Sequence, residues 1–256
     1  MLWHVAETNL YLMGSIHVLD VPTPPLNAEI KRVYSAAKRI VFEARLDQQP
    51  DISSAIFADG DCLSRNISAQ LFSDTQKLWL TLGLPEAELE RIRPWFAALR
   101  LAMTLLAREG FTINQGVDKY FWERAIKDQL LIANLESMSA SLTAFASTSN
   151  DDQERFLAMT VERKDAVVSK TASMVRGWKE NRIEPMIEVL NSHFELFPQL
   201  YTKLLYERNE QWMAKLLEFA QDDIPTLAMV GALHFTGSRS LQILFQNHGF
   251  VVSQVD

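Results

Sequence analysis

The sequence predicts an α/β fold of the α+β type. Helices flank a central mixed sheet, large helical insertions interrupt it, and an active site lies at the strand ends. Three observations predict this fold. Short apolar runs that end in glycine or glutamate alternate with helical patterns, and strand signals gather around helical blocks. The 256 residues include 48% hydrophobic and 22% charged residues, the balance of an ordinary folded core.

The N-terminal part of the chain predicts a strand, a helix and a further strand. Apolar runs at 3–6 and 10–13, separated by a polar cluster, predict a hairpin that leads to Gly14. Apolar residues at helical spacing over 26–37 predict a helix, and the next apolar run predicts a buried strand ending at Glu43. The first glycine motif and the first glutamate therefore both follow strands.

Helical signals dominate the middle of the chain. In segment 64–112, Ser73 has the spacing of a capping-box residue. A later apolar run predicts a strand that ends at Glu136, and segment 148–221 then carries only helical signals. We interpret both helical segments as parts of a single domain that spans residues 1–256.

The C-terminal part returns to strands. The apolar run 226–230 predicts a strand that leads into Gly231. A helix is expected after it, with Gly249 as its end signal, and residues 250–252 predict a last strand.

Two short segments at opposite ends of the sequence match each other. Residues 11–17 and 228–234 both read as an apolar run, a glycine, a small residue, a branched apolar residue and a histidine. A glycine at a strand end allows a sharp turn or a close approach to a ligand because it has no Cβ. Sites of α/β proteins usually lie at the carboxyl ends of strands. If the two strands are neighbours, His17 and His234 lie at the same edge of the sheet.

These histidines and the strand-end glutamates carry the predicted chemistry. His17 and His234, with Glu43 and Glu136, supply the nitrogen and carboxylate ligands that Zn²⁺, Mn²⁺ or Co²⁺ prefer. The same residues allow a metal-free alternative, in which an imidazole held by a carboxylate acts as a general base on water. Structural roles stay open for each of them: a hydrogen-bonded histidine, a solvated strand end at Glu43, or a cap for the segment after Glu136.

Two further charged residues stand out. Asp118 follows Gly116 and is expected in the first turn of a helix, where a carboxylate is favoured for electrostatic reasons. Arg208 lies on the same helical row as Leu204 and Trp212, which reads as a buried face. A buried arginine requires a carboxylate partner or a ligand.

Composition limits the class of protein. A net charge of −7 spread along the chain argues against nucleic acid as a partner. We find neither an apolar stretch long enough to span a membrane nor a signal peptide, so the chain as written is expected in the cytoplasm, or exported if a leader was removed. Cys62 is the only cysteine and lies in no recognisable motif. The sequence leaves a homo-oligomer open.

The motifs together resemble the TraB/PrgY/GumN family, which includes the Tiki-type metalloproteases. Their order and spacing match over nearly the whole chain. One departure is Ser141, where members usually carry a glutamine after the Leu-Glu pair. The matching features are residues 12–17, Val41 to Glu43, Gly116 to Asp118, Leu135 with Glu136, Glu207 to Asn209, and 230–234 followed by Gly237.

The resemblance implies a fold like that of the erythromycin-esterase and ChaN-like proteins, and metal-dependent peptide hydrolysis. His17 and His234 would be metal ligands or the catalytic pair, and Glu43 a ligand or the general base. Arg208 would anchor either the substrate or the acidic residues, and Glu136 would support the site from behind the ligands. The expected substrate-binding residues are Gly14, Gly231, Asp118 and Glu136.

The predicted function is therefore a metal-dependent hydrolase that acts on a peptide or another small molecule and uses Mn²⁺, Co²⁺ or Zn²⁺. Two alternatives remain. The chain could sequester a peptide or small ligand without turnover, or it could hydrolyse esters without a metal, with His17 as the base.

Overall fold

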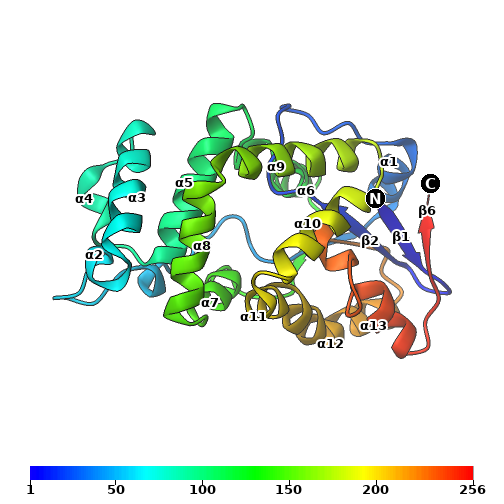
Figure 1. Ribbon diagram of the computed structural model, residues 1–256. Coiled ribbons are helices and arrows are strands. Elements are labelled where there is room, and N and C mark those ends of the chain that lie inside the picture. The colour runs from blue at the N-terminus through cyan, green and yellow to red at the C-terminus, as the bar shows by residue number, and fades with distance from the viewer. Residues whose placement is uncertain (256) are drawn as a thin grey trace. The chain divides into compact units, whose positions relative to one another are not determined.

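The computed structural model describes residues 1–255 and contains a six-stranded sheet (Figure 1). The strand order is β4-β3-β5-β2-β1-β6. β2, β5, β3 and β4 run parallel to one another, whereas β1 is antiparallel to β2 and to β6. The sheet is therefore mixed, as predicted. The strands are β1 Leu2–Val5, β2 Leu10–Ser15, β3 Arg39–Phe42, β4 Leu131–Asn134, β5 Thr226–Gly231 and β6 Val252–Val255.

Helices occupy most of the chain between the strands, which confirms the predicted α/β class. The longer helices are α1 Ala28–Ala36, α3 Ala69–Thr81, α5 Pro94–Arg108, α6 Val117–Lys127, α8 Asn150–Glu162, α9 Lys164–Lys179, α10 Glu184–Phe194 and α12 Glu207–Gln221. Shorter ones are α2 Leu63–Asn66, α4 Glu86–Leu89, α7 Ala140–Ala146, α11 Pro198–Tyr201 and α13 Leu241–Asn247. The 3₁₀ turns are η1 Ser53–Ala55, η2 Ile113–Gln115 and η4 Ala232–Phe235, and η3 Thr202–Tyr206 is a π-helical turn.

The chain divides into two compact units. The sheet unit comprises residues 1–49 and 112–138 together with the chain from Ser173 onward, and the helical unit comprises 50–111 and 139–172. All six strands belong to the sheet unit. The predicted helical segment 148–221 is helical over most of its length but is shared between the units. The assignment of the whole chain to one domain stays a prediction.

The register of the parallel strands brings the two glycine motifs together. Ser15 pairs with Gly231, and Gly14 pairs with Val230, so the two motifs lie on neighbouring strands with an offset of one residue. β5 is central among the parallel strands, and all six of its residues are buried. A strand covered on both faces reads as a continuous apolar run, which is why periodicity found β5 easily. The strand ends of β2, β3, β4 and β5 meet at one edge.

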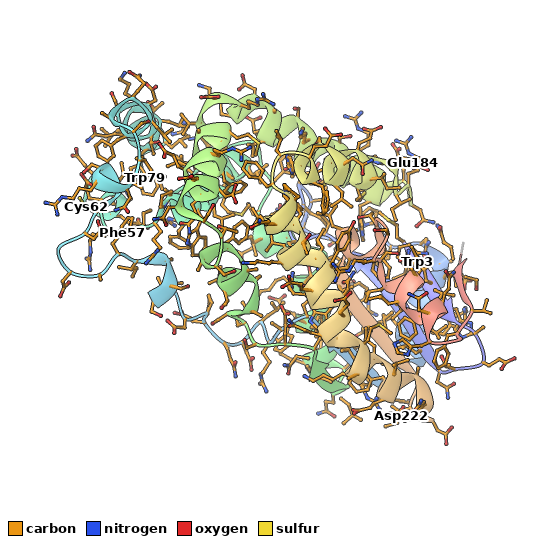
Figure 2. All side chains as sticks on the ribbon, turned by 60° about the horizontal axis from the view of Figure 1, so that its bottom comes forward. Trp3, Phe57, Cys62, Trp79, Glu184 and Asp222 are labelled. Atoms are coloured by element: carbon orange, nitrogen blue, oxygen red, sulfur yellow. The ribbon has the colours of Figure 1, made fainter. Side chains whose placement is uncertain are left out.

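The helical unit has its own apolar core. Trp79 is fully buried there and donates its indole N–H to the carbonyl of Pro85 at 2.9 Å (Figure 2). The core also contains Leu63, Leu71, Leu89, Leu101 and Leu157.

Two predicted boundaries are wrong. α3 begins at Ala69, because the side chain of Ser68 accepts the N–H of Leu71 and forms the cap that was predicted at Ser73. β6 begins two residues later than predicted, because Phe250 closes the end of α13 through its N–H to Phe245. Within residues 1–255, no helix is long and apolar enough to cross a membrane.

Leu101→Ala should destabilise the protein strongly. Leu101 is fully buried in the helical unit, and removing such a side chain costs about 2–5 kcal/mol in the free energy of unfolding. Urea denaturation followed by circular dichroism measures the change. Leu80→Ala is the control, since Leu80 is 47% exposed and its loss should cost about 0.5 kcal/mol or less. Equal losses in the two variants would contradict the assigned core.

Candidate active site

His17 lies just beyond the end of β2 and contacts a carboxylate. Its Nδ1 is 2.9 Å from Oδ2 of Asp118. The other carboxylate oxygen, Oδ1, accepts the hydroxyl of Ser15 at 2.6 Å. An ionised carboxylate only accepts hydrogen bonds, so Nδ1 of His17 carries the proton and donates it. Nε2 of His17 faces the rest of the site.

A glycine allows this contact to form. Gly116 ends η2 directly before α6, and a Cβ at this position would overlap the carbonyl of His17. The backbone there is held by the N–H of Val117, which donates to the carbonyl of Ile16 at 2.9 Å. Because Gly116 has no Cβ, the start of α6 lies directly against the His17 segment. Asp118, in the first turn of that helix, then reaches the imidazole.

His234 occupies a different environment from His17. It lies in η4, directly after β5, and is 3% exposed. Its Nδ1 is 2.6 Å from Oδ1 of Asn209, and its ring centroid is 4.5 Å from that of Trp212. The side chain of His17, in contrast, is 61% exposed. The two matching motifs therefore place one histidine at the surface and one in the interior.

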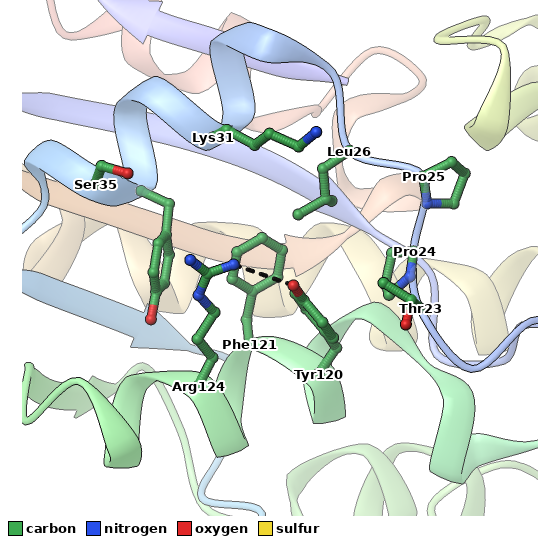
Figure 3. Close-up of a pocket in the computed structure, with 10 residues that line it drawn as sticks. Thr23, Pro24, Pro25, Leu26, Lys31, Ser35, Tyr120, Phe121 and Arg124 are labelled. Carbon is green, nitrogen blue, oxygen red and sulfur yellow. Dashed lines mark hydrogen bonds between the residues drawn. The ribbon is translucent and has the colours of Figure 1, made fainter.

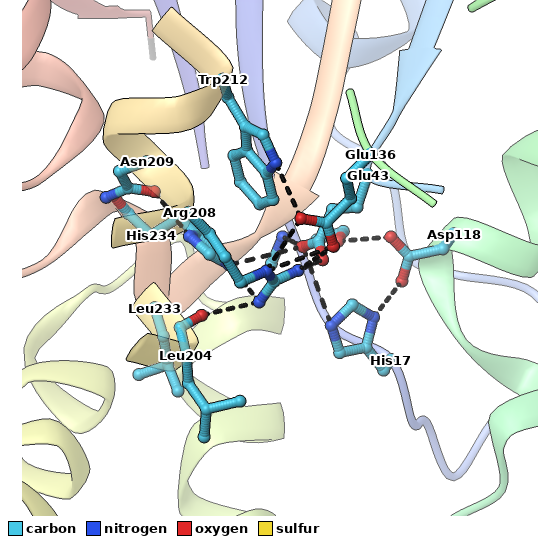
Figure 4. A network of polar contacts seen from close by, with 12 residues as sticks. His17, Glu43, Asp118, Glu136, Leu204, Arg208, Asn209, Trp212, Leu233 and His234 are labelled. Atoms are coloured by element: carbon cyan, nitrogen blue, oxygen red, sulfur yellow. Dashed lines mark hydrogen bonds and ion pairs between the residues drawn. The ribbon is translucent and has the colours of Figure 1, made fainter. Parts of the chain in front are cut away.

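The two strand-end glutamates are joined by one guanidinium (Figure 4). Nη2 of Arg208 donates to Glu43 at 2.5 Å and to Glu136 at 2.8 Å, and its Nε also contacts both oxygens of Glu136. Glu136 accepts the indole N–H of Trp212 at 2.9 Å, and Glu43 accepts the N–H of Gly231 at 2.6 Å. Arg208 was expected to anchor either the substrate or the acidic residues, and in the structure it contacts the acidic residues.

The π-helical turn η3 directly precedes α12, in which Arg208 is the second residue. At its end the N–H of Glu207 reaches back five residues to the carbonyl of Thr202. The carbonyl of Leu204 accepts the Nη1 of Arg208 at 2.7 Å. Such wide turns occur frequently at functional sites. Here the turn supplies a backbone acceptor that holds the guanidinium in place, and no signal in the sequence predicts it.

His17, His234 and Glu43 converge on one point. Oε1 of Glu43 is 4.0 Å from Nε2 of His17 and 3.7 Å from Nε2 of His234. A Cβ on Gly231 would lie 3.2 Å from both Oε1 of Glu43 and Nε2 of His17. The missing side chain of Gly231 therefore leaves a small space between these three groups.

Burial and neighbouring charges shift the pKa values of Glu43 and His234. Burial by itself raises the pKa of Glu43, but Arg208 and the two imidazoles outweigh it, so its pKa lies well below the usual value. Burial lowers the pKa of His234 to about 3; Glu43 opposes this shift and Arg208 adds to it. At neutral pH, Glu43 is an anion and His234 is an uncharged imidazole.

The pKa of the exposed histidine, His17, is shifted in the opposite direction. Attraction to the Asp118 carboxylate outweighs desolvation and raises the pKa of His17 to about 9. Because most of its side chain is exposed, water screens part of this attraction. The pair of imidazoles thus differs in charge at neutral pH, although both carry a proton on Nδ1.

The donor set fits a divalent cation in its chemistry. Two imidazole nitrogens with their Nδ1 engaged elsewhere, and one carboxylate oxygen, face the space at Gly231, which is how metal-binding histidines are usually oriented. As placed, however, no group of three or more His, Cys, Asp or Glu side chains within residues 1–255 is arranged to hold a metal ion. A cation bound there would lie near the guanidinium of Arg208, because Nη1 of Arg208 is 3.4 Å from Nε2 of His234.

The predicted substrate-binding residues lie around this point with different surroundings. Gly14 is in the interior of the sheet, where its carbonyl accepts the indole N–H of Trp178 at 2.8 Å. Asp118 and Glu136 each hold another site residue, and Gly231 borders the central space. Their roles in substrate binding stay predictions.

Sequence reasoning missed the side chains that hold the predicted ones. Asn209 appeared only as part of the Glu207 to Asn209 motif, and Ser15 and Trp178 were not singled out. Each is buried and makes a hydrogen bond to a residue far away in sequence. Such a contact leaves no periodic signal in the sequence.

A separate pocket of about 440 Å³ lies between α1, α6 and residues 23–26 (Figure 3). Its lining includes the buried aromatic rings of Tyr34 and Phe121. Arg124 at its rim is already engaged, since it donates to Tyr120 at 3.1 Å and pairs with Asp128 at 3.5 Å. None of the predicted site residues lines this pocket. The candidate site is therefore identified by the functional groups that lie close together in it, and not by the volume of a cavity.

Comparison with known proteins gives a family. The model of the TraB/PrgY/gumN family matches residues 1–254, which confirms the resemblance that the motifs indicated. Searches of the curated proteins and of the solved structures found no match. The likeness to erythromycin-esterase and ChaN-like folds stays a prediction.

Asp118→Asn should destabilise the protein in a pH-dependent way. The raised pKa of His17 means that its attraction to Asp118 contributes fully below pH 6.5, the ordinary value, and is lost as the pH rises through about 9. The difference in Tm between parent and variant should therefore be largest near pH 6 and shrink toward pH 10. Differential scanning fluorimetry with a chelator present measures it.

Asp47→Asn is the matched control for this pH series. Asp47 pairs with Arg45, whose guanidinium does not titrate in this range, so its Tm difference should stay constant. A Tm difference for Asp118→Asn that is equally constant would contradict the assigned ion pair.

Proposed function

The chain belongs to the TraB/PrgY/gumN family, and from this membership and the geometry of its site we propose that it is a metal-dependent hydrolase whose substrates are peptides. One observation carries the proposal. The Nε2 atoms of His17 and His234 lie within 4.0 Å of the same Glu43 oxygen.

His17, His234 and Glu43 would hold the cation. Two imidazoles and one carboxylate form a donor set of catalytic zinc sites that leaves a position open for water. A bound cation would lower the pKa of a water molecule and polarise a carbonyl oxygen. The proposal includes Zn²⁺, Mn²⁺ and Co²⁺ and does not choose among them.

The remaining groups position these three. The N–H of Gly231 and the guanidinium of Arg208 hold the two oxygens of Glu43 in a fixed direction. In the proposal this carboxylate also accepts the proton of the activated water, because it faces the space where that water would lie. The exposed side of His17 is the side from which a substrate would enter.

The pairing of His17 with Asp118 supports a second candidate, a hydrolase without a metal. An imidazole whose Nδ1 donates to a carboxylate is the arrangement of a general base in many hydrolases, and it acts as a base in the form whose Nε2 has lost its proton. Activity that survives complete chelation would favour this candidate. Activity that is lost on chelation and restored by one cation would favour the first.

His17→Ala and His234→Ala should both lose bound metal and peptide cleavage. The measurement is metal analysis of the purified protein, followed by hydrolysis of a mixed peptide library with added Mn²⁺, Co²⁺ or Zn²⁺. Glu43→Gln should lower kcat/KM by about 10²–10⁴-fold, the usual contribution of a general base. His248→Ala is the control, because this exposed histidine follows α13 and is not in the site. A parent protein without metal or cleavage would overturn the proposal.

Gly231→Ala should inactivate the protein without unfolding it. The φ of Gly231 is −53°, which alanine adopts without strain, and alanine keeps the N–H that Glu43 accepts. The new methyl would lie in the space between Glu43 and His17. Loss of metal binding and cleavage at an unchanged Tm is the expected result. Full activity in Gly231→Ala would show that this space is not where the chemistry occurs.

A further inference from the structure

Asn209 is buried on α12, one residue after the arginine that joins the two glutamates. We propose that Asn209 is a positioning residue, whose amide fixes the tautomer of His234 so that Nε2 presents a lone pair toward Glu43. That this tautomer serves catalysis rests on the proposed function, whereas the tautomer itself does not.

The orientation of the Asn209 amide follows from its partners. Its Nδ2 donates to the carbonyl of His234 at 3.2 Å and to the carbonyl of Arg239 at 2.9 Å. Carbonyl oxygens only accept hydrogen bonds. A flipped amide would place its own oxygen against both carbonyls and leave three buried acceptors unpaired, which is strongly unfavourable. The amide therefore holds one orientation.

The orientation of the amide decides the proton on the imidazole. With Nδ2 committed to two carbonyls, Oδ1 of Asn209 faces Nδ1 of His234 at 2.6 Å. Because an amide oxygen cannot donate, Nδ1 must carry the hydrogen. Nε2 faces a guanidinium, which can only donate, so Nε2 keeps its lone pair as the acceptor. The Nη1 donor of Arg208, 3.4 Å from Nε2, agrees with an acceptor at that position.

The choice of an amide separates His234 from the other histidine. Asp118 is a carboxylate and stabilises a charged His17, whereas a neutral amide gives no such stabilisation to a charged His234. A second imidazolium would lie beside the guanidinium of Arg208, where like charges repel. Asn209 thus keeps the hydrogen on Nδ1, as Asp118 does at His17, but does not stabilise a charge on His234.

Asn209 also fixes the position of the ring. Its three hydrogen bonds join α12 to the turn η4 and to the backbone at Arg239. Arg239 is itself tied to α12 through an ion pair with Glu210 at 2.5 Å. Arg208 and Asn209, adjacent on one helix, therefore place the carboxylates and the imidazole relative to each other.

Nitrogen NMR of metal-free protein labelled with ¹⁵N-histidine tests the proposal without any assay of activity. The parent should show a pyrrole-type Nδ1 and a pyridine-type Nε2 for His234 between pH 6 and 8. Spectra of His234→Ala assign the signals. A parent with a protonated Nε2, or with both tautomers in rapid exchange, would overturn the proposal, and neither result requires a variant of Asn209 to fold.

A variant of Asn209 tests whether this residue fixes the tautomer of His234. Asn209→Ala should bring the two nitrogen shifts toward their mean and lower kcat/KM by about 10–100-fold, as is usual when a group behind a metal ligand is lost. An unchanged tautomer in Asn209→Ala would assign it to another group.

Leu216→Ala controls for loss of stability. Leu216 is fully buried on the same helix and its side chain has no polar atom, so its truncation destabilises the protein without removing a hydrogen bond of His234, and the nitrogen shifts should match the parent. If the parent proves to have no hydrolase activity, the proposed function fails while the NMR result still decides the tautomer.

Discussion

The site depends on a single buried guanidinium. Arg208 is 8% exposed and contacts Glu43 and Glu136, which follow two neighbouring strands. Without it, two carboxylates with side chains that are 15% and 10% exposed would face each other unpaired. Removing one partner of such a buried arrangement typically costs about 3–5 kcal/mol. The ion pairs therefore join α12 to the carboxyl edge of the sheet, and the positions of the other groups follow.

Around this arginine, one sequence motif is used in two ways. β2 and β5 pair with an offset of one residue, so His17 extends into solvent while His234 turns back in η4 beneath Trp212. A carboxylate supports the exposed imidazole and an amide supports the buried one. Both rings present Nε2 to Glu43, yet they differ in charge at neutral pH. This division gives the site a charged imidazole at the surface and an uncharged imidazole in its interior.

Glycines at the site act through the absence of a side chain and not through unusual backbone angles. Gly116 lets α6 lie against the His17 segment, and Gly231 leaves the space that the two histidines and Glu43 border. The carboxyl ends of parallel strands offer this opportunity because the chain must leave the sheet there. The functional groups therefore come from loops, while strands that are buried throughout hold those loops in place.

The sequence by itself determined the mixed α/β class, the two Gly-x-x-His motifs, the strand-end positions of Glu43 and Glu136, and the need of Arg208 for a partner. These follow from periodicity and from the cost of burying a charge, both of which act locally. Only the tertiary structure decided which partner Arg208 takes, how unequal the two histidines are, where the π-helical turn lies, and that Asn209 holds His234. The reason is physical: each depends on hydrogen bonds, burial or packing between segments distant in sequence, and such contacts leave no repeat in the chain.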